Sequence, residues 1–192
     1  LLAEVAQARQ AEAQARNDEA LVQSLQSLDK GQPPKLKARV VAVVSAKGGV
    51  GKTTLSAALA TLMQVPGGQT LALDLDPQNA LQHHLSVSPD VAGMGNASLR
   101  GESWSTLVLP GSAGTHVLPF GVMSEDERRS LEGYLRNDSG WLARQLARMA
   151  LGEHDVVVID TPPGPSAYLD QVLAVADQVV VVEVAHANLA QR

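Results

Sequence analysis

The sequence predicts an α/β fold in which a mostly parallel β-sheet is covered by helices on both faces. Three observations support this prediction. Short aliphatic runs alternate with stretches of helical period from about residue 39 onward. The runs at 156–159 and 179–184 are dominated by β-branched residues, which is typical of strands buried on both faces. A glycine-rich loop separates the first run from the first helical stretch, as in parallel α/β proteins that bind phosphate groups.

The expected elements follow from these patterns in chain order. Strands are expected at 40–45, 70–75, 116–119, 156–159 and 179–184. Helices are expected at 52–64, 80–85, 140–150 and 166–176, with a short helix around 97–107. Ser124 and Glu127 have the spacing of a capping box, so a further helix is expected to begin after Ser124.

The N-terminal segment differs in composition from the rest. Residues 1–28 contain no glycine or proline and are rich in good helix formers, with Leu21, Leu25 and Leu28 on one face. The sequence KGQPPK at 30–35 then breaks the helix and is typical of a linker. We therefore expect a helical extension and linker at 1–37 and the main domain at 38–192. The extension is either peripheral or a partner-binding segment, and both interpretations stay open.

Composition narrows the function classes. The net charge of −5 over 192 residues gives no general attraction to nucleic acid or anionic lipid, which leaves room only for a local basic patch. The absence of cysteine excludes disulfides and iron–sulfur clusters in this chain. The most apolar stretch, 172–185, contains Asp177 and Glu183 and is too short and too charged to span a bilayer. No secretory signal pattern is present, so a cytoplasmic location is expected. The first residue is Leu1 and not methionine, so we expect the natural N-terminus to lie further upstream.

The glycine-rich loop opens the helical stretch that begins at residue 52. Glycines let successive backbone N–H groups turn toward phosphate oxygens, and the helix N-terminus adds positive partial charge. In this pattern Lys52 reaches the β- and γ-phosphates of a nucleotide and the Thr53 hydroxyl ligates Mg²⁺. Ala46 replaces the usual first glycine, which fits a deviant form of the loop that begins at Lys47. The predicted nucleotide-binding residues are Lys47, Gly48, Gly49, Val50, Gly51, Lys52, Thr53 and Thr54.

Carboxylates follow two other predicted strands. Asp74 and Asp76 end the second aliphatic run, and strand alternation places them on the same side. Asp160 follows the run 156–159, at the position where P-loop proteins bind Mg²⁺. The sequence TPPG at 161–164 forms a loop suited to sensing a γ-phosphate. Alone, Asp74 or Asp76 would be more typical of a helix cap or a solvated turn, but beside a phosphate loop they indicate a catalytic and magnesium site.

Together these segments resemble the ParA/MinD family of ATP-dependent dimeric switches, from about residue 39 to the end of the chain. The resemblance implies a P-loop NTPase fold, ATP and Mg²⁺ as cofactors, and an ATP-dependent homodimer. It also implies weak ATPase activity in which Lys47 reaches the partner's phosphates, Asp76 positions the attacking water and Lys52 binds the substrate phosphates. Thr53, Asp74 and Asp160 would organise Mg²⁺. Family members continue past the position of Arg192 to their adenine-binding residues, so we expect the fold here to be C-terminally truncated.

A narrower resemblance is to the BcsQ proteins of bacterial cellulose-synthesis operons. It is carried by NAL at 79–81 followed by LSV at 85–87, by GESW at 101–104, and by LPFG at 118–121 leading into SEDE at 124–127. This resemblance implies a switch that helps to place or assemble the cellulose secretion machinery, with other secretion components as partners through the 1–28 helix. It also implies recruitment to the inner face of the membrane by those partners.

Two alternatives to this function stay open. One is a partition ATPase that moves cargo over the nucleoid, which needs a basic DNA-binding face. The other is a scaffold that binds ATP without hydrolysing it. Four arginines, which could form such a face, lie among acidic residues, and a mixed charged surface is the favoured interpretation. They are Arg128, Arg129, Arg144 and Arg148.

Two further pairs of residues have ordinary interpretations. His83 and His84 are adjacent and point to different sides of a helix, so they are not expected to share a metal ion. Trp104 and Trp141 are expected to pack in the core.

Overall fold

The computed structural model describes residues 34–88 and 90–183 of the chain. The predicted helix at 1–28 and most of the predicted linker lie outside the described residues, so that helix and the domain boundary near residue 37 stay predictions. The described residues from Lys35 onward belong to one compact unit.

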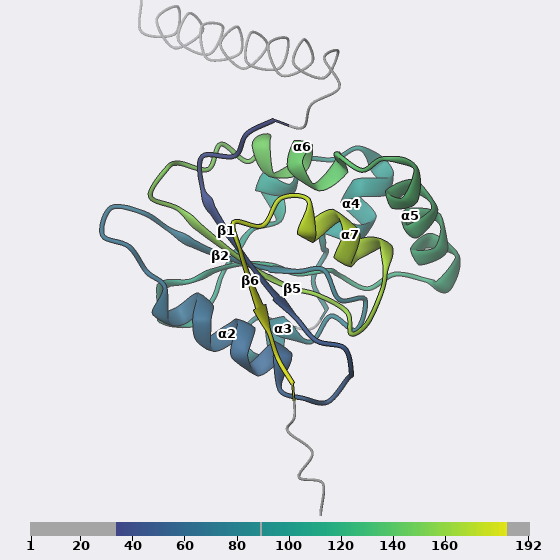
Figure 1. Ribbon diagram of the computed structural model, residues 1–192. Helices are drawn as coiled ribbons and strands as arrows, with labels where there is room; N and C mark the ends of the chain where they lie inside the picture. Colours follow the sequence, from purple (N-terminus) through teal and green to yellow (C-terminus); the bar gives the residue numbers. More distant parts are fainter. Residues whose placement is uncertain (1–33, 89, 184–192) are drawn as a thin grey trace, which may run out of the picture. The chain divides into compact units, whose positions relative to one another are not determined.

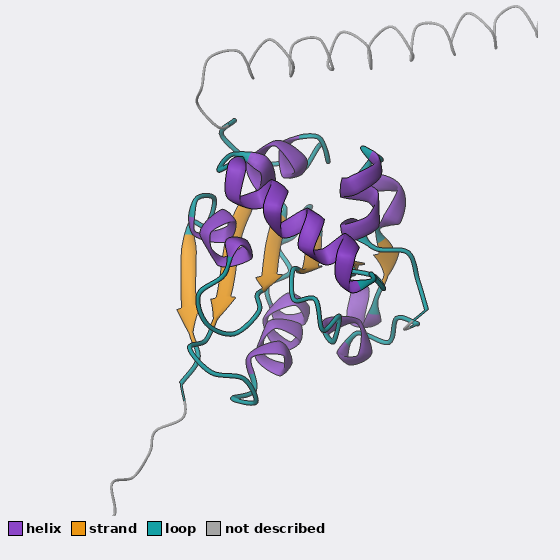
Figure 2. Cartoon of the chain, turned by 90° about the vertical axis from the view of Figure 1, so that its right-hand side faces the viewer, coloured by secondary structure: helices purple, strands orange, loops and turns teal. Residues whose placement is uncertain are grey.

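The described part of the chain forms a six-stranded sheet in the order β3-β4-β2-β5-β1-β6. Neighbouring strands pair in parallel, except that β3 runs antiparallel to β4. The predicted mostly parallel sheet is therefore confirmed, and Figure 2 shows the strands side by side. The strands are β1 (Arg39–Val44), β2 (Thr70–Asp74), β3 (Leu109–Pro110), β4 (His116–Leu118), β5 (Val156–Asp160) and β6 (Gln178–Val181).

Helices cover both faces of this sheet, as predicted (Figure 1). One face carries α2 (Lys52–Leu62) and α3 (Leu81–His84). The other face carries α4 (Met94–Arg100), α5 (Glu125–Asn137), α6 (Trp141–Ala147) and α7 (Ala167–Leu173). Two short 3₁₀ turns, η1 (Trp104–Leu107) and η2 (Ser112–Gly114), flank β3. No helix in residues 34–88 or 90–183 has the length and apolar composition needed to cross a membrane.

Strand alternation divides the buried side chains between two cores. In β1, Val40 and Ala42 pack with the α4–α7 layer, whereas Val41 and Val43 pack with α2 and α3. The central strands β2 and β5 are buried along their whole length, which agrees with the apolar runs LAL and VVVI that precede their terminal aspartates. The predicted packing of Trp104 and Trp141 is confirmed, because their rings meet edge to face with centroids 5.3 Å apart.

Two sequence-based expectations about secondary structure are wrong. The run 179–184 was expected to form a strand buried on both faces, but β6 lies at an edge of the described sheet. Val179 and Val181 are 44% and 61% exposed. The short helix expected at 97–107 is instead divided into α4 and η1, because Gly101 adopts a left-handed conformation (φ 69°) that ends α4.

The predicted capping box at the start of α5 is present with both of its hydrogen bonds. The Glu127 N–H donates to the Ser124 hydroxyl (3.2 Å), and the Ser124 N–H donates to the Glu127 carboxylate (2.8 Å). These contacts lower the pKa of Glu127. The capping box therefore fixes where α5 begins, next to the loop that follows β4.

Candidate functional site

The phosphate loop connects β1 to α2 at the carboxyl end of the sheet, where ligands of parallel α/β folds bind. Gly49 (φ 74°) and Gly51 (φ 87°) adopt left-handed conformations that residues with a Cβ rarely adopt. Gly51 is the residue that immediately precedes the first turn of α2. Gly48 has no such requirement, and a Cβ on it would make ordinary contact with Pro163 at 3.8 Å. The loop therefore owes its conformation to two of its three glycines.

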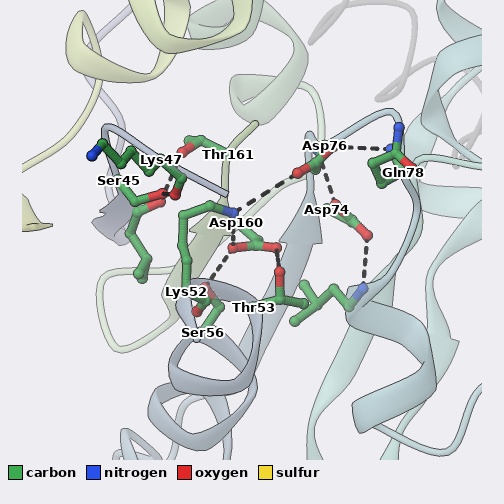
Figure 3. A network of polar contacts seen from close by, with 12 residues as sticks. Ser45, Lys47, Lys52, Thr53, Ser56, Asp74, Asp76, Gln78, Asp160 and Thr161 are labelled. Atoms are coloured by element: carbon green, nitrogen blue, oxygen red, sulfur yellow. Dashed lines mark hydrogen bonds and ion pairs between the residues drawn. The ribbon is translucent and has the colours of Figure 1, made fainter. Parts of the chain in front are cut away.

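Asp160, at the end of β5, lies at the centre of the site and is fully buried. Its carboxylate accepts a hydrogen bond from the Lys52 ammonium (2.8 Å) and another from the Thr53 hydroxyl (2.7 Å), as Figure 3 shows. Burial of a carboxylate is unfavourable unless its oxygens find such partners. The first turn of α2 is therefore bound to the end of β5 through a single carboxylate.

Ser56 is a member of this site that sequence reasoning missed. It is fully buried, and its hydroxyl lies 2.8 Å from an Asp160 carboxylate oxygen and 3.0 Å from the Lys52 carbonyl oxygen. The spacing of Ser56 from Lys52 could have predicted its place in the site, because residues four positions apart lie on the same face of a helix. A polar residue at that position in an otherwise apolar helix face indicates a buried polar partner.

Asp74 and Asp76 lie beside this cluster, at the carboxyl end of β2. Asp74 pairs in register with Asp160 on the neighbouring strand and accepts the Asp76 N–H (2.9 Å) and the Leu81 N–H (3.0 Å). The Asp76 carboxylate is 3.9 Å from the Lys52 ammonium and accepts the Gln78 N–H (2.9 Å). The structure thus brings together the carboxylates and Lys52 that the sequence predicted for one site.

Burial perturbs both of these carboxyl groups. Burial first, and then the nearby Asp160 charge, raise the pKa of Asp74 to about 8, against its backbone hydrogen bonds. Burial also raises the pKa of Asp76, although the Gln78 hydrogen bond and the Lys52 charge oppose that shift. A cation beside Asp74 would favour its charged form and lower this pKa.

The oxygen donors of the site fit Mg²⁺. They are the Thr53 hydroxyl and the Asp160 and Asp74 carboxylates, which are hard oxygen ligands of the kind that Mg²⁺ prefers. Residues 34–88 and 90–183 contain no group of three or more His, Cys, Asp or Glu side chains arranged to hold a metal ion. Mg²⁺ in nucleotide sites uses one or two carboxylates, waters and the substrate phosphates, so it does not require such a group.

The loop after β5 is attached to the start of the phosphate loop at two points. The Thr161 hydroxyl donates to the Val43 carbonyl oxygen (2.8 Å), and the Gly164 N–H donates to the Ser45 carbonyl oxygen (2.8 Å). Movement of this loop would therefore be transmitted directly to the phosphate loop.

The structure does not bring the two lysines of the loop together. Lys47 is exposed, and in Figure 3 its ammonium points away from the cluster of carboxylates, whereas the Lys52 ammonium points into it. Lys47 is held through its backbone, because the Ser45 hydroxyl donates to its carbonyl oxygen (2.9 Å). This position suits a residue that acts outside the carboxylate cluster.

A cleft of about 480 Å³ opens beside Asp76, between the loops that follow β2 and β5 and helix α5. Arg129 on its wall pairs with Glu125 (2.9 Å) and Asp126 (3.4 Å). Arg144 pairs with Asp138, further along the chain. These pairs favour the mixed charged surface over a basic face. His83 and His84 are both exposed, which agrees with a solvated helix face.

Comparisons with known proteins show which family the chain resembles. A family profile described as "Cellulose biosynthesis protein BcsQ" matches residues 38–192. The cellulose biosynthesis protein BcsQ of Escherichia coli (strain K12) is 30% identical over 152 residues, which cover 78% of this chain and 60% of that protein. The chromosome-partitioning ATPase Soj of Thermus thermophilus is 35% identical over 149 residues, which cover 77% of this chain and 55% of that protein.

A solved structure shows the same fold. Cobyrinic acid a,c-diamide synthase from Mycobacterium smegmatis, with a bound ATP analogue and magnesium, superposes with a TM-score of 0.65 at 32% identity. The match covers 76% of this chain and 60% of that one. The chain likewise spans only 60% of the length of its E. coli relative. Because the family profile matches the domain from Ala38 onward, the chain belongs to the BcsQ family of ParA/MinD-type P-loop proteins.

Proposed function

We propose that this protein is an ATP-binding and ATP-hydrolysing dimeric switch that assists localisation or assembly of the cellulose synthesis and secretion machinery. The observation that carries the proposal is the cluster in which Lys52 and Thr53, the first residues of α2, meet the buried Asp160. Such an arrangement of lysine, hydroxyl and carboxylate suits a nucleotide phosphate chain bound together with a divalent cation. The name of the family supports the link to cellulose.

Nucleotide phosphates would bind over the phosphate loop, at the N-terminus of α2. The backbone N–H groups of that end are free of intrahelical partners by geometry and carry positive partial charge. The Lys52 ammonium already lies among carboxylates, so phosphate oxygens would compete with Asp160 and Asp76 for it. Thr53, Asp74 and Asp160 would hold Mg²⁺, which supplies positive charge to the phosphate oxygens when bound.

Hydrolysis and dimerisation are assigned to different residues. Asp76 would orient the attacking water, because its carboxylate lies at the edge of the site and borders the cleft. Lys47, exposed and turned away from the cluster, would contact the phosphates of the partner subunit. ATP would then join two subunits, and hydrolysis would release them.

A second candidate function is a scaffold that binds ATP without hydrolysing it. The observation that favours it is the cleft beside Asp76, whose charged wall could contact a partner. A partition ATPase is less well supported, because Arg129 and Arg144 are paired with acidic residues. We also propose that the 1–28 helix contacts partners. The protein would be cytoplasmic, and those partners would recruit it to the inner face of the membrane.

Replacing Lys52 tests the nucleotide site. Lys52→Ala should lower ATP affinity by about 1.5–3 kcal/mol, or roughly ten- to a hundredfold, because charge-assisted contacts to the phosphates are lost. Titration calorimetry on the full-length protein measures this, with Arg136→Ala, an exposed residue of α5 outside the phosphate loop, as a control that should keep its affinity. If Lys52→Ala does not fold, Lys52→Gln keeps a hydrogen-bond donor for Asp160. Equal ATP affinity in wild type and both Lys52 variants would contradict the assignment.

Two substitutions with opposite effects test the switch. Asp76→Ala should bind ATP, hydrolyse it about 10²–10⁴-fold more slowly and accumulate as an ATP-bound dimer, because the water loses its positioning group. Lys47→Ala should bind ATP through Lys52 and remain monomeric. Size-exclusion chromatography with light scattering, with and without Mg-ATP, separates these outcomes. A monomeric Asp76→Ala in saturating ATP, or a normal dimer of Lys47→Ala, would favour the scaffold function.

The raised pKa of Asp74 predicts a pH-dependent signal for magnesium. With a pKa of about 8, Asp74 is mainly protonated at pH 7, and a cation beside it favours the charged form. Mg-ATP binding at pH 7 should therefore release protons, and the release should fade above about pH 9, where the group is already charged. Calorimetry at pH 7 in two buffers of different ionisation enthalpy counts the protons. Release that persists unchanged in Asp74→Asn would show that another group is responsible.

Deleting residues 1–30 tests the proposed partner segment. The deletion should leave ATP affinity unchanged and weaken the capture of other cellulose-secretion components in a pull-down, because the leucine face is lost. A matched variant with Leu21, Leu25 and Leu28 replaced by serine should reproduce the effect. Loss of ATP binding or of folding after the deletion would mean that the segment is structural.

A further inference from the structure

The turn that carries Asp76 is closed by a residue with no assigned role, Asn79. The Asn79 N–H donates to the Asp76 carbonyl oxygen (2.8 Å), and the Asp76 carboxylate accepts the Gln78 N–H (2.9 Å). The direction of the Asp76 carboxylate is therefore set by the conformation of residues 76–79. Figure 3 shows the contact between Asp76 and Gln78 within this turn, next to the Lys52 ammonium.

Asn79 is both conformationally unusual and buried. Its backbone lies in the left-handed region (φ 52°), which asparagine adopts more readily than most residues, and it is only 8% exposed. Its side-chain oxygen accepts the backbone N–H of Gly121 at 3.0 Å, 42 residues away in the sequence. The turn is thus joined by a side chain to the loop that follows β4.

That loop is held firmly by the surrounding elements. Gly121 lies in the left-handed region (φ 86°), and a Cβ on it would come within 2.6 Å of the Gly93 nitrogen at the start of α4. The Gly95 N–H donates to the Phe120 carbonyl oxygen (3.0 Å), which adds a second contact with α4. The Phe120 ring packs edge to face on Tyr168 of α7, with centroids 5.8 Å apart. Phe120 and Gly121 therefore form an anchor shared by α4 and α7.

We propose that Asn79 is a positioning residue for hydrolysis, which fastens the Asp76 turn to the Phe120–Gly121 anchor and so aims the Asp76 carboxylate. The inference rests on the role proposed above for Asp76. It explains why two short segments that are far apart in the sequence, NAL at 79–81 and LPFG at 118–121, meet in space. Asn79 does not touch the reacting atoms in this assignment, so its effect is on turnover and not on ATP affinity.

A set of matched variants separates the hydrogen bond from the backbone conformation. Asn79→Gly tolerates the positive φ but removes the side-chain oxygen, whereas Asn79→Asp keeps both an acceptor for Gly121 and a residue type that tolerates this φ. Ser86→Gly is the control for the added backbone freedom, because Ser86 also has a positive φ (62°) and is exposed. The full-length protein is used, with kcat and KM for Mg-ATP, ATP affinity and thermal melting measured for each.

Asn79→Gly should lower kcat by about tenfold or more, because even a small displacement of the Asp76 carboxylate would slow hydrolysis. KM and ATP affinity should stay within about twofold of wild type. Ser86→Gly should stay within about threefold of wild type in kcat. Asn79→Asp should lose less kcat than Asn79→Gly, because it keeps the acceptor for Gly121 but adds a buried charge near Asp76. A normal kcat in Asn79→Gly, while Asp76→Ala is inactive, would overturn this inference and leave the proposed function standing. Parallel loss of kcat, ATP affinity and melting temperature in Asn79→Gly would also overturn it, since that pattern marks a purely structural residue.

Discussion

The buried charge of Asp160 is the constraint on which the site depends. A fully buried carboxylate needs compensating partners, and here it has the Lys52 ammonium together with the Thr53 and Ser56 hydroxyls. Lys52 is itself only 6% exposed, so the pair is buried on both sides. Removing one partner of a buried ion pair typically costs about 3–5 kcal/mol. These contacts fix both the rotation of α2 about its axis and its height along β5.

While Asp160 fixes α2, the loop after β5 and the turn after β2 are attached to different parts of the molecule. The loop after β5 is attached to the phosphate loop through Thr161 and Gly164. The turn after β2 is attached to the opposite layer through Asn79 and Gly121. Tyr168, which follows the first of these loops in the chain, packs on Phe120 beside the second attachment. The loops at the edge of the site therefore have direct contacts with both the phosphate loop and the α4–α7 layer of the molecule.

The sequence predicts the features that depend on local pattern. Local sequence patterns of about ten residues or fewer predict the buried strands β1, β2 and β5, the start of α5 after Ser124 and the phosphate loop. The structure contains each of these features. The exposure of β6 was missed, because apolar composition does not distinguish an edge strand from a central one. Ser56 contacts Asp160, 104 residues away, and Asn79 contacts Gly121, 42 residues away. No local sequence pattern predicts contacts between residues so far apart. Composition and periodicity describe an element, whereas these contacts depend on how elements pack.

The pairing of Lys52 with Asp160 bears on how a nucleotide would bind. Phosphate oxygens that took Lys52 away would leave Asp160 buried without its countercharge, which is unfavourable. A divalent cation at the oxygens of Asp160 and Thr53 would remove that penalty, but alone it would face the positive charge of Lys52 at close range. Under the proposed function, Lys52 would hold phosphate oxygens while Asp160 and Thr53 would hold Mg²⁺, so that both charges of the buried pair would keep a partner. Each ligand would then make the binding of the other more favourable, and the buried ion pair would be the source of the free energy that couples them.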